Sequence, residues 1–171
     1  NINGNWTQIG SDINGEAPGD YSGNSISLSA DGSIVAIGAS HNDGNGSNSG
    51  HVRIYRNINN TWTQIGSDID GEARDLSGAS VSLSSDGSVV AIGATEAWDG
   101  SDSGHVRIYK NINNTWTQIG SDIDGEASGD ESGRSVSLSS DGTIVAIGAS
   151  WNNGSGTYSG HVRIYKNESG T

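Results

Sequence analysis

Closely spaced carboxylates are the first residues in this sequence that could do chemistry. The segment Ser-Asp-Ile-Asp-Gly-Glu-Ala occurs at residues 67–73 and again at residues 121–127. Alternating carboxylates beside a glycine bend resemble calcium-binding loops, because calcium is held by about six to eight oxygen ligands. An earlier copy, at residues 11–17, has Asn14 in place of the second aspartate. The candidate calcium ligands are Asp68, Asp70, Glu72, Asp122, Asp124 and Glu126.

A recurring histidine is the second candidate. The motif Ser-Gly-His-Val-Arg-Ile-Tyr occurs three times, with its histidine at His51, His105 and His161. Each histidine belongs to a different copy of the motif, so the three rings are expected to diverge instead of sharing one metal ion. We interpret them as structural residues, each paired with a nearby backbone group or carboxylate.

Aromatic side chains in polar loops are the third candidate. Trp98, Trp151 and Tyr158 lie in stretches rich in glycine, asparagine and serine, where a core position is hard to explain. Exposed rings of this kind can stack on the apolar face of a sugar, so we predict a ligand-binding surface. The alternative is that each ring anchors its own loop. The candidate ligand-binding residues are His41, Asp43, Trp98, Asp99, Arg134, Trp151 and Tyr158.

Catalysis is not predicted. The sequence has no Gly-x-Ser-x-Gly elbow between a strand and a helix. Paired carboxylates such as Asp70 and Glu72 have no apolar pocket that would raise the pKa of one of them. The chain has 20 acidic and 8 basic residues, a net charge of −12, and no cysteine. This charge argues against nucleic-acid binding, and no apolar run is long enough for membrane insertion.

An internal repeat must position these candidate residues. The His-Val-Arg-Ile-Tyr motif recurs with a period close to 55 residues. The Asp-Gly pairs at residues 31–32, 86–87 and 141–142 recur with the same period. A repeat of this length and fidelity indicates duplication of one structural unit.

Each repeat predicts four short β-strands. Residues 25–28 alternate between serine and apolar side chains, which is the period of a strand. Residues 34–39 form a continuous run of small apolar side chains, typical of a strand covered on both faces, and a tight Asp-Gly turn joins the two. Residues 51–55 and 62–69 supply the third and fourth strands. The predicted fold is all-β, with three four-stranded antiparallel sheets that form β-propeller blades.

The motifs also resemble a known family. Residues 132–150, followed by Ser-Gly-His-Val-Arg-Ile-Tyr, resemble the FG-GAP class of β-propeller repeats in its short, non-integrin form. Ser-Gly at residues 132–133 stands where the family has Phe-Gly, and Gly-Ala-Ser at residues 148–150 stands where it has Gly-Ala-Pro. All three copies fit this pattern. The resemblance implies an extracellular or cell-surface β-propeller used in binding or adhesion.

The first turn of each repeat departs from the integrin-type pattern. Those relatives carry a calcium loop of the Asp-x-Asn-x-Asp-Gly kind between the first two strands. Here the corresponding turn is Ser-Ala-Asp-Gly at residues 29–32. One carboxylate cannot supply the oxygen ligands that calcium needs. Any calcium is therefore expected at the acidic segments described above and not at this turn.

The chain begins and ends at different strands of the repeat. With the four strands lettered a to d from the centre outward, the order is d, abcd, abcd, abc. Three blades are fewer than the four to eight of known rings. The predicted propeller segment, residues 1–171, divides into strand d at residues 1–13 and blades at residues 14–69, 70–123 and 124–171.

The open order predicts that the chain is its own partner. Residues 6–13 are expected to pair with residues 161–165 of another set of blades, in the same or another copy. Either the chain is part of a longer array of blades, or copies join head to tail and give a closed ring or a filament. The tryptophans of the outer strand, Trp6, Trp62 and Trp116, are expected to pack between blades because they repeat unchanged.

Differences between the copies fall in two kinds of loop. The loops between strands b and c, and those between strands d and a, vary, whereas the strands are nearly identical. In an antiparallel meander both kinds of loop lie at one end, which also carries most of the acidic residues. We predict that this face binds a glycan or a surface protein. Free drift of loop sequences, and a structural repeat that polymerises, are the alternatives.

Overall fold

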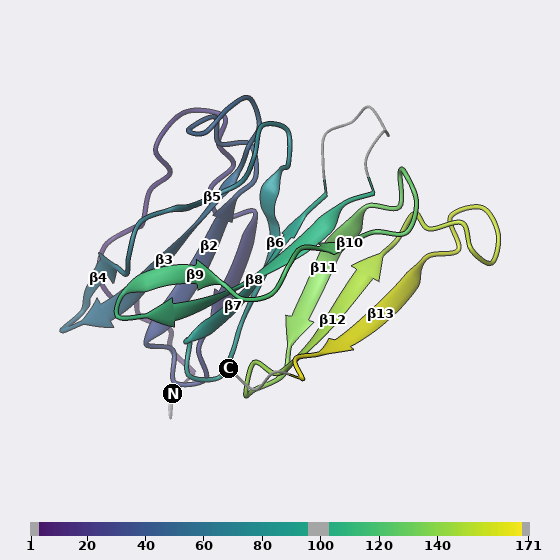
Figure 1. The fold of residues 1–171 in the computed structure, drawn as a ribbon. Helices are drawn as coiled ribbons and strands as arrows, with labels where there is room; N and C mark the ends of the chain where they lie inside the picture. Colours follow the sequence, from purple (N-terminus) through teal and green to yellow (C-terminus); the bar gives the residue numbers. More distant parts are fainter. Residues whose placement is uncertain (1–3, 96–102, 169–171) are drawn as a thin grey trace.

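The described part of the chain is built from β-strands. The computed structural model describes residues 4–95 and 103–168, which contain thirteen strands and no helix. These residues therefore hold no helix that could cross a membrane. The strands form three antiparallel sheets that follow one another along the chain and lie side by side (Figure 1). The all-β class and the three antiparallel sheets are confirmed.

The first sheet has the strand order β1-β2-β3-β4, and β5 also pairs with β3. Its strands are antiparallel, with Ala36 opposite Ile54 in the centre of the sheet. β2 is buried along its whole length, as expected for a strand covered on both faces. The strands are β1 (Ser25–Leu28), β2 (Ile34–Ala39), β3 (His51–Ile58), β4 (Thr61–Gln64) and β5 (Ile69–Asp70).

The second and third sheets repeat this plan. The second sheet also has five strands, whereas the third has the order β11-β12-β13. Strand β13 is therefore an edge strand within the described residues. The second sheet contains β6 (Ser77–Leu83), β7 (Val89–Ala94), β8 (His105–Ile112), β9 (Thr115–Gln118) and β10 (Ile123–Asp124). The third contains β11 (Ser132–Leu138), β12 (Ile144–Ala149) and β13 (His161–Lys166).

Two connections differ in detail from the sequence prediction. The link between the first two strands spans residues 29–33 and is not a two-residue hairpin turn; within it, Gly32 has a φ of 71°. The outer strand, predicted over residues 62–69, is split into β4 and β5. Gly66 lies between the two pieces with a φ of 73°, a conformation that interrupts a β-ladder. Both pieces pair with β3, so they occupy the predicted fourth position.

The hydrophobic core lies between neighbouring sheets. Val52 and Ile54 of the first sheet pack in one cluster with Val81 and Leu83 of the second sheet. A second cluster joins the second and third sheets in the same way. Small β-branched side chains fill these layers, so each sheet depends on its neighbour for burial.

Glycines set the close approach between sheets. Gly93 in β7 lies against Gly133 of the third sheet, and Gly38 in β2 lies against Gly78 of the second sheet. A Cβ atom on Gly93 would overlap the carbonyl oxygen of Gly133. The Ser-Gly and Gly-Ala pairs of the family-like motif are therefore the points where backbones of adjacent sheets touch.

The amino-terminal segment does not form the predicted strand. Residues 4–13 have no strand pairing, neither with β13 nor with another described strand, and the sheets do not close into a ring. The segment nevertheless has the local structure of an outer strand. Gln8 bonds Asp12 at 2.8 Å, as Gln64 bonds Asp68 at 2.6 Å. It forms no β-ladder because no described strand c lies beside it, as β3 lies beside β4 in the first sheet.

The prediction that the tryptophans pack between blades is confirmed for Trp116. Trp116 packs against the core between the first two sheets, and Trp62 packs against a cluster that includes Ile13. The indole of Trp62 donates a hydrogen bond to the carbonyl of Ile9 at 2.9 Å. The prediction was wrong for Trp6, which is 93% exposed because no sheet among the described residues covers it.

The glycine contacts lead to a stability prediction. We expect Gly93→Ala to lower the free energy of unfolding by about 2 to 3 kcal/mol, because the added methyl group would force adjacent backbones apart. The matched control is Gly148→Ala, at the equivalent position of the third sheet, where an added Cβ would meet only Ser135. Chemical denaturation of dilute protein measures both. Equal losses in the two variants would contradict the assignment.

Candidate functional site

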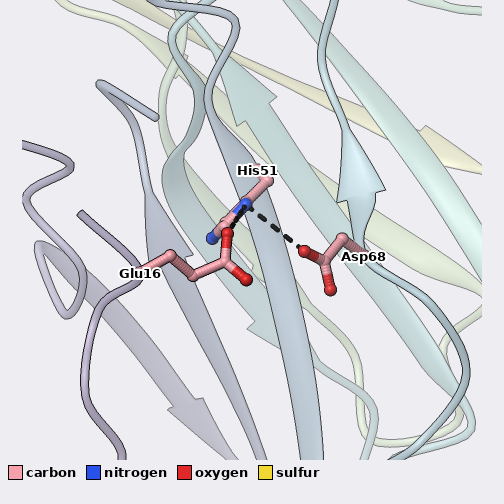
Figure 2. A group of neighbouring side chains, drawn as sticks. All are labelled: Glu16, His51 and Asp68. Carbon is pink, nitrogen blue, oxygen red and sulfur yellow. Dashed lines mark ion pairs between the residues drawn. The ribbon is translucent and has the colours of Figure 1, made fainter. Parts of the chain in front are cut away.

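A buried histidine and two carboxylates meet at the start of the third strand of the first sheet. His51 is buried, and its Nδ1 atom lies 3.6 Å from Asp68 and 3.9 Å from Glu16 (Figure 2). Glu16 comes from the loop before β1 and Asp68 from the gap between β4 and β5. Within residues 4–95 and 103–168, these three are the one group of potential metal ligands close enough to share an ion.

An arginine balances this group. Arg53, two residues after His51 on the same face of β3, lies 3.5 Å from Glu16 and donates a hydrogen bond to the carbonyl of Asn14 at 2.7 Å. The strand thus presents histidine and arginine to the acidic loop at its edge.

The second sheet contains a stronger version of the same cluster. Arg107 bonds Asp122 at 2.9 Å, Asp75 at 3.1 Å and Glu72 at 3.2 Å. Burial opposes the ionised form of Asp122, but its bonds from Gln118 and Arg107 outweigh burial and lower its pKa. Burial, with the charge of Arg107, lowers the pKa of His105. In the third sheet His161 and Arg163 face Glu126, at 3.6 and 3.8 Å.

The repeated cluster therefore has a structural role in each sheet, as the histidine interpretation expects. It ties strand c to the loop that precedes strand a of the same sheet and, in the first two sheets, also to the outer strand through Asp68 and Asp122. In the first sheet the imidazole and two carboxylates also form a donor set of the kind that suits zinc better than calcium. Arg53 would compete with a cation for Glu16.

The predicted calcium ligands contact different residues of the protein. Asp68 faces His51, Glu72 faces Arg107 of the second sheet, and Asp122 bonds Arg107. Asp70 in β5 lies opposite His51, and Asp124 in β10 lies opposite His105. Burial and the charge of Asp68 raise the pKa of Asp70. Calcium binding at these residues stays a prediction.

The first turn of each repeat uses its aspartate internally. Asp31 accepts hydrogen bonds from the backbone and hydroxyl of Ser33 and from the hydroxyl of Ser29. These bonds lower the pKa of Asp31 to about 2. Asp141 accepts the same set of bonds in the third sheet, and its pKa is also about 2. The carboxylate caps a turn.

Buried aspartate–asparagine pairs hold the variable loops together. Asn42 of the b–c loop donates to Asp20 of the d–a loop at 3.0 Å, and Asn152 donates to Asp130 at 2.7 Å. All four residues are buried. The two kinds of loop therefore lie at one end of the sheets, and we call this end the loop face. Sequence reasoning missed these pairs, although the recurrence of Asp20, Asp75 and Asp130 was a signal.

Aromatic pairs lie on the loop face. His41 packs edge-on against Tyr21, with ring centroids 4.7 Å apart. Trp151 and Tyr158 pair at 5.6 Å, and both are exposed. Tyr21 was not among the predicted ligand-binding residues.

The other predicted binding residues differ in their surroundings. Asp43 accepts a bond from the backbone of Asn48 at 2.7 Å and so braces its own loop. Arg134 is exposed and pairs with Glu131 at 2.9 Å. Trp98 and Asp99 lie outside the described residues.

Comparison with known proteins supports the resemblance. A family model described as FG-GAP repeat matches residues 14–55, which include the cluster residues Glu16 and His51. The FG-GAP-type resemblance is thus confirmed over the first repeat. An FG-GAP repeat suggests a β-propeller-like module. Repeats of this family are generally non-catalytic and typically occur in extracellular proteins. No curated protein matches the chain.

The arginine cluster leads to a second prediction. Arg107→Met should lower the free energy of unfolding by about 3 kcal/mol at pH 7, because Asp75 and Asp122 would lose their buried partner. The contribution of Asp122 is present above its unfolded pKa and is lost as the pH falls. The difference from wild type should therefore narrow below about pH 4. The control is Arg56→Met, since Arg56 is exposed on the same type of strand. An equal effect of both variants would rule out a cluster-specific role.

The turn aspartates lead to a pH prediction. Because their folded pKa of about 2 is below the ordinary value of 3.8, Asp31 and Asp141 stabilise the fold above about pH 4 and lose this effect as the pH falls toward 2. We expect the Asp31→Asn, Asp141→Asn double variant to be less stable at pH 7 and less sensitive to acid between pH 4 and 2. Thermal melting across pH measures this. Glu168→Gln, at an exposed position, should behave like wild type.

Proposed function

We propose that this chain is a non-enzymatic, extracellular β-propeller-type module that binds a carbohydrate or a surface ligand through its loop face. The supporting observation is the exposed Trp151–Tyr158 pair. The pair lies on the b–c loop of the third sheet, and the buried hydrogen bond from Asn152 to Asp130 holds this loop in place. A rigid base with exposed rings suits stacking on a sugar.

A comparison of the first and third b–c loops shows what is specific to the Trp151–Tyr158 pair. Both loops share one hydrogen-bond frame, in which Asn42 and Asn152 each accept a bond from the backbone two residues on, at 2.8 Å. On this shared frame the first loop carries His41 where the third carries Trp151. The loops thus differ in the side chains that they carry at these positions and not in their scaffold.

Tyr158 occupies a costly backbone conformation. Its φ is 52°, and the equivalent residue of the first loop, Asn48, has a φ of 50°. Asparagine tolerates this left-handed region, whereas a bulky side chain there is an outlier. Strain of this kind is often retained where a side chain has a function. The strained tyrosine beside Trp151 supports a binding role over free drift of the loop.

The binding proposal predicts a separation of affinity from stability. Trp151→Ala, alone or with Trp98→Ala, should weaken carbohydrate binding about fivefold for each stacking ring worth about 1 kcal/mol. The melting temperature should change little, since Trp151 is exposed. The probes are neutral and acidic oligosaccharides, tested singly by titration calorimetry beside a melting curve. A parallel loss of folding would make the rings loop anchors.

The first loop supplies matched control variants. Tyr158→Asn installs the residue that the first loop has at this φ, and should raise the melting temperature while lowering affinity. Trp151→His installs the other residue of the first loop. If no oligosaccharide binds the wild-type chain, or if both variants bind as it does, the carbohydrate proposal fails.

A further inference from the structure

The first and third sheets expose apolar faces whose counterparts are buried inside the chain. Ile54 of the first sheet is 1% exposed, whereas Ile164 at the same position of the third sheet is 71% exposed. Leu83 of the second sheet is 7% exposed, whereas Leu28 of the first is 57% exposed. We call the face with Ile144, Val162 and Ile164 the tail face, and the face with Ile26 and Leu28 the head face.

The two faces are the halves of one kind of interface. Residues equivalent to the tail face, such as Val52 and Ile54, pack in the chain against residues equivalent to the head face, Val81 and Leu83. A tail face therefore already contacts a head face between the first two sheets. The same contact recurs between the second and third sheets. Exposed apolar faces such as these are unfavourable in water and often mark a site where another protein binds.

A groove of about 350 Å³ lies between the second and third sheets, near their outer edge. Its walls include Ile108, Ile119, Leu138 and Tyr165. The equivalent position between the first and second sheets is filled by Trp116, which packs against that core and donates to the carbonyl of Ile65 at 2.9 Å. No tryptophan is among the described residues that line this groove.

Trp6 has the properties of the missing ring. It begins the same Trp-Thr-Gln-Ile-Gly sequence as Trp116, and it is almost fully exposed. Its segment matches the outer strand of the first sheet at two points, because Gly10 and Gly66 have φ values of 74° and 73°, and Gln8 bonds Asp12 as Gln64 bonds Asp68. The segment also lies on the same side of the chain as the head face, since Ile13 packs on the first sheet.

We propose that the tail face and groove bind the head face and amino-terminal strand of a second copy of this chain. Residues 6–13 of the second copy add to the edge of β13, and Trp6 fills the groove and donates to Ile119. A single rigid placement of the second copy makes both contacts at once, with Trp6 in the groove and Leu28 on the tail face. The reason is that Trp6 is placed relative to Leu28 as Trp116 is placed relative to the equivalent residue of the next sheet in the repeat. The exposed edge of β13 is then paired.

Polar groups at the two ends also match. Ser25 and Ser80 donate to Gly78 and Gly133 of the following sheet, both at 2.7 Å. The equivalent serine of the third sheet, Ser135, lies at the tail face, and the equivalent glycine, Gly23, lies at the head face. Ser135 of one copy would therefore bond Gly23 of the next. A second copy satisfies the apolar, aromatic and polar groups together, which favours it over an unrelated partner.

Two charge variants test the contact at separate ends. Ile164→Asp disables the tail face and Ile26→Asp disables the head face, and both residues are exposed, so each monomer should still fold. Sedimentation velocity of residues 1–171 should show wild-type assemblies and monomers of either variant. Trp6→Ala should weaken assembly at least tenfold. The control is Ile58→Asp, because Ile58 and its equivalent Ile112 are both exposed and lie outside the contact.

Mixing the two variants provides the decisive measurement. Ile26→Asp retains a working tail face, and Ile164→Asp retains a working head face. An equimolar mixture should form a one-to-one heterodimer of twice 17.5 kDa and nothing larger. A monomeric wild-type chain at every concentration, as expected if another protein or further chain fills the groove, overturns the proposal. So does assembly of either variant alone at the wild-type level, or a mixture that stays monomeric while both variants melt as folded proteins.

Discussion

Packing of one sheet on the next is the interaction on which this structure depends. A single sheet carries only a few isoleucine and valine side chains per strand, too few to bury enough apolar area alone. Contact becomes favourable because Gly38 and Gly93 let the backbones of adjacent sheets touch, so small side chains such as Val52 and Ile54 reach full burial. The serine hydroxyls that bond across the gap fix the register of neighbours. Burial therefore arises between repeats, as in other repeat proteins.

The same dependence explains the differences between identical sequences. The strand Ile-Val-Ala-Ile-Gly-Ala is fully buried in β2 and only partly buried in β12. Nothing in the strand itself accounts for this difference. The second sheet covers one face of β2, and the amino-terminal segment covers the other, where Ile13 packs against Val35 and Ile37. Within the described residues, β12 has a neighbouring sheet on one face only. The exposed faces are thus a consequence of position in the array, and they are built from the residues that elsewhere form the core.

Much of the fold could be predicted from the sequence because its strands have simple patterns. Alternation in residues 25–28 and the continuous apolar run in residues 34–39 placed β1 and β2 correctly. The break between β4 and β5 could not be seen, since it depends on the backbone angle of Gly66. Within the site, the strand position of His51 was evident, but its approach to Glu16 depends on a loop that folds back over the sheet. The exposure of Trp6 was missed because sequence identity with Trp116 carries no information about neighbours.

The loop face and the end faces are physically linked. Leu76 donates its backbone amide to Asn48 of the preceding sheet at 3.0 Å. The equivalent residues at the two ends of the chain are Tyr21 and Tyr158, both exposed and both with positive φ. A head-to-tail contact that repeats the internal geometry would bring these tyrosines together. The Tyr21–His41 pair of one copy would then adjoin the Trp151–Tyr158 pair of the next. Assembly would in this way enlarge the aromatic surface and present it several times, and several weak contacts on one surface give higher avidity than any one of them.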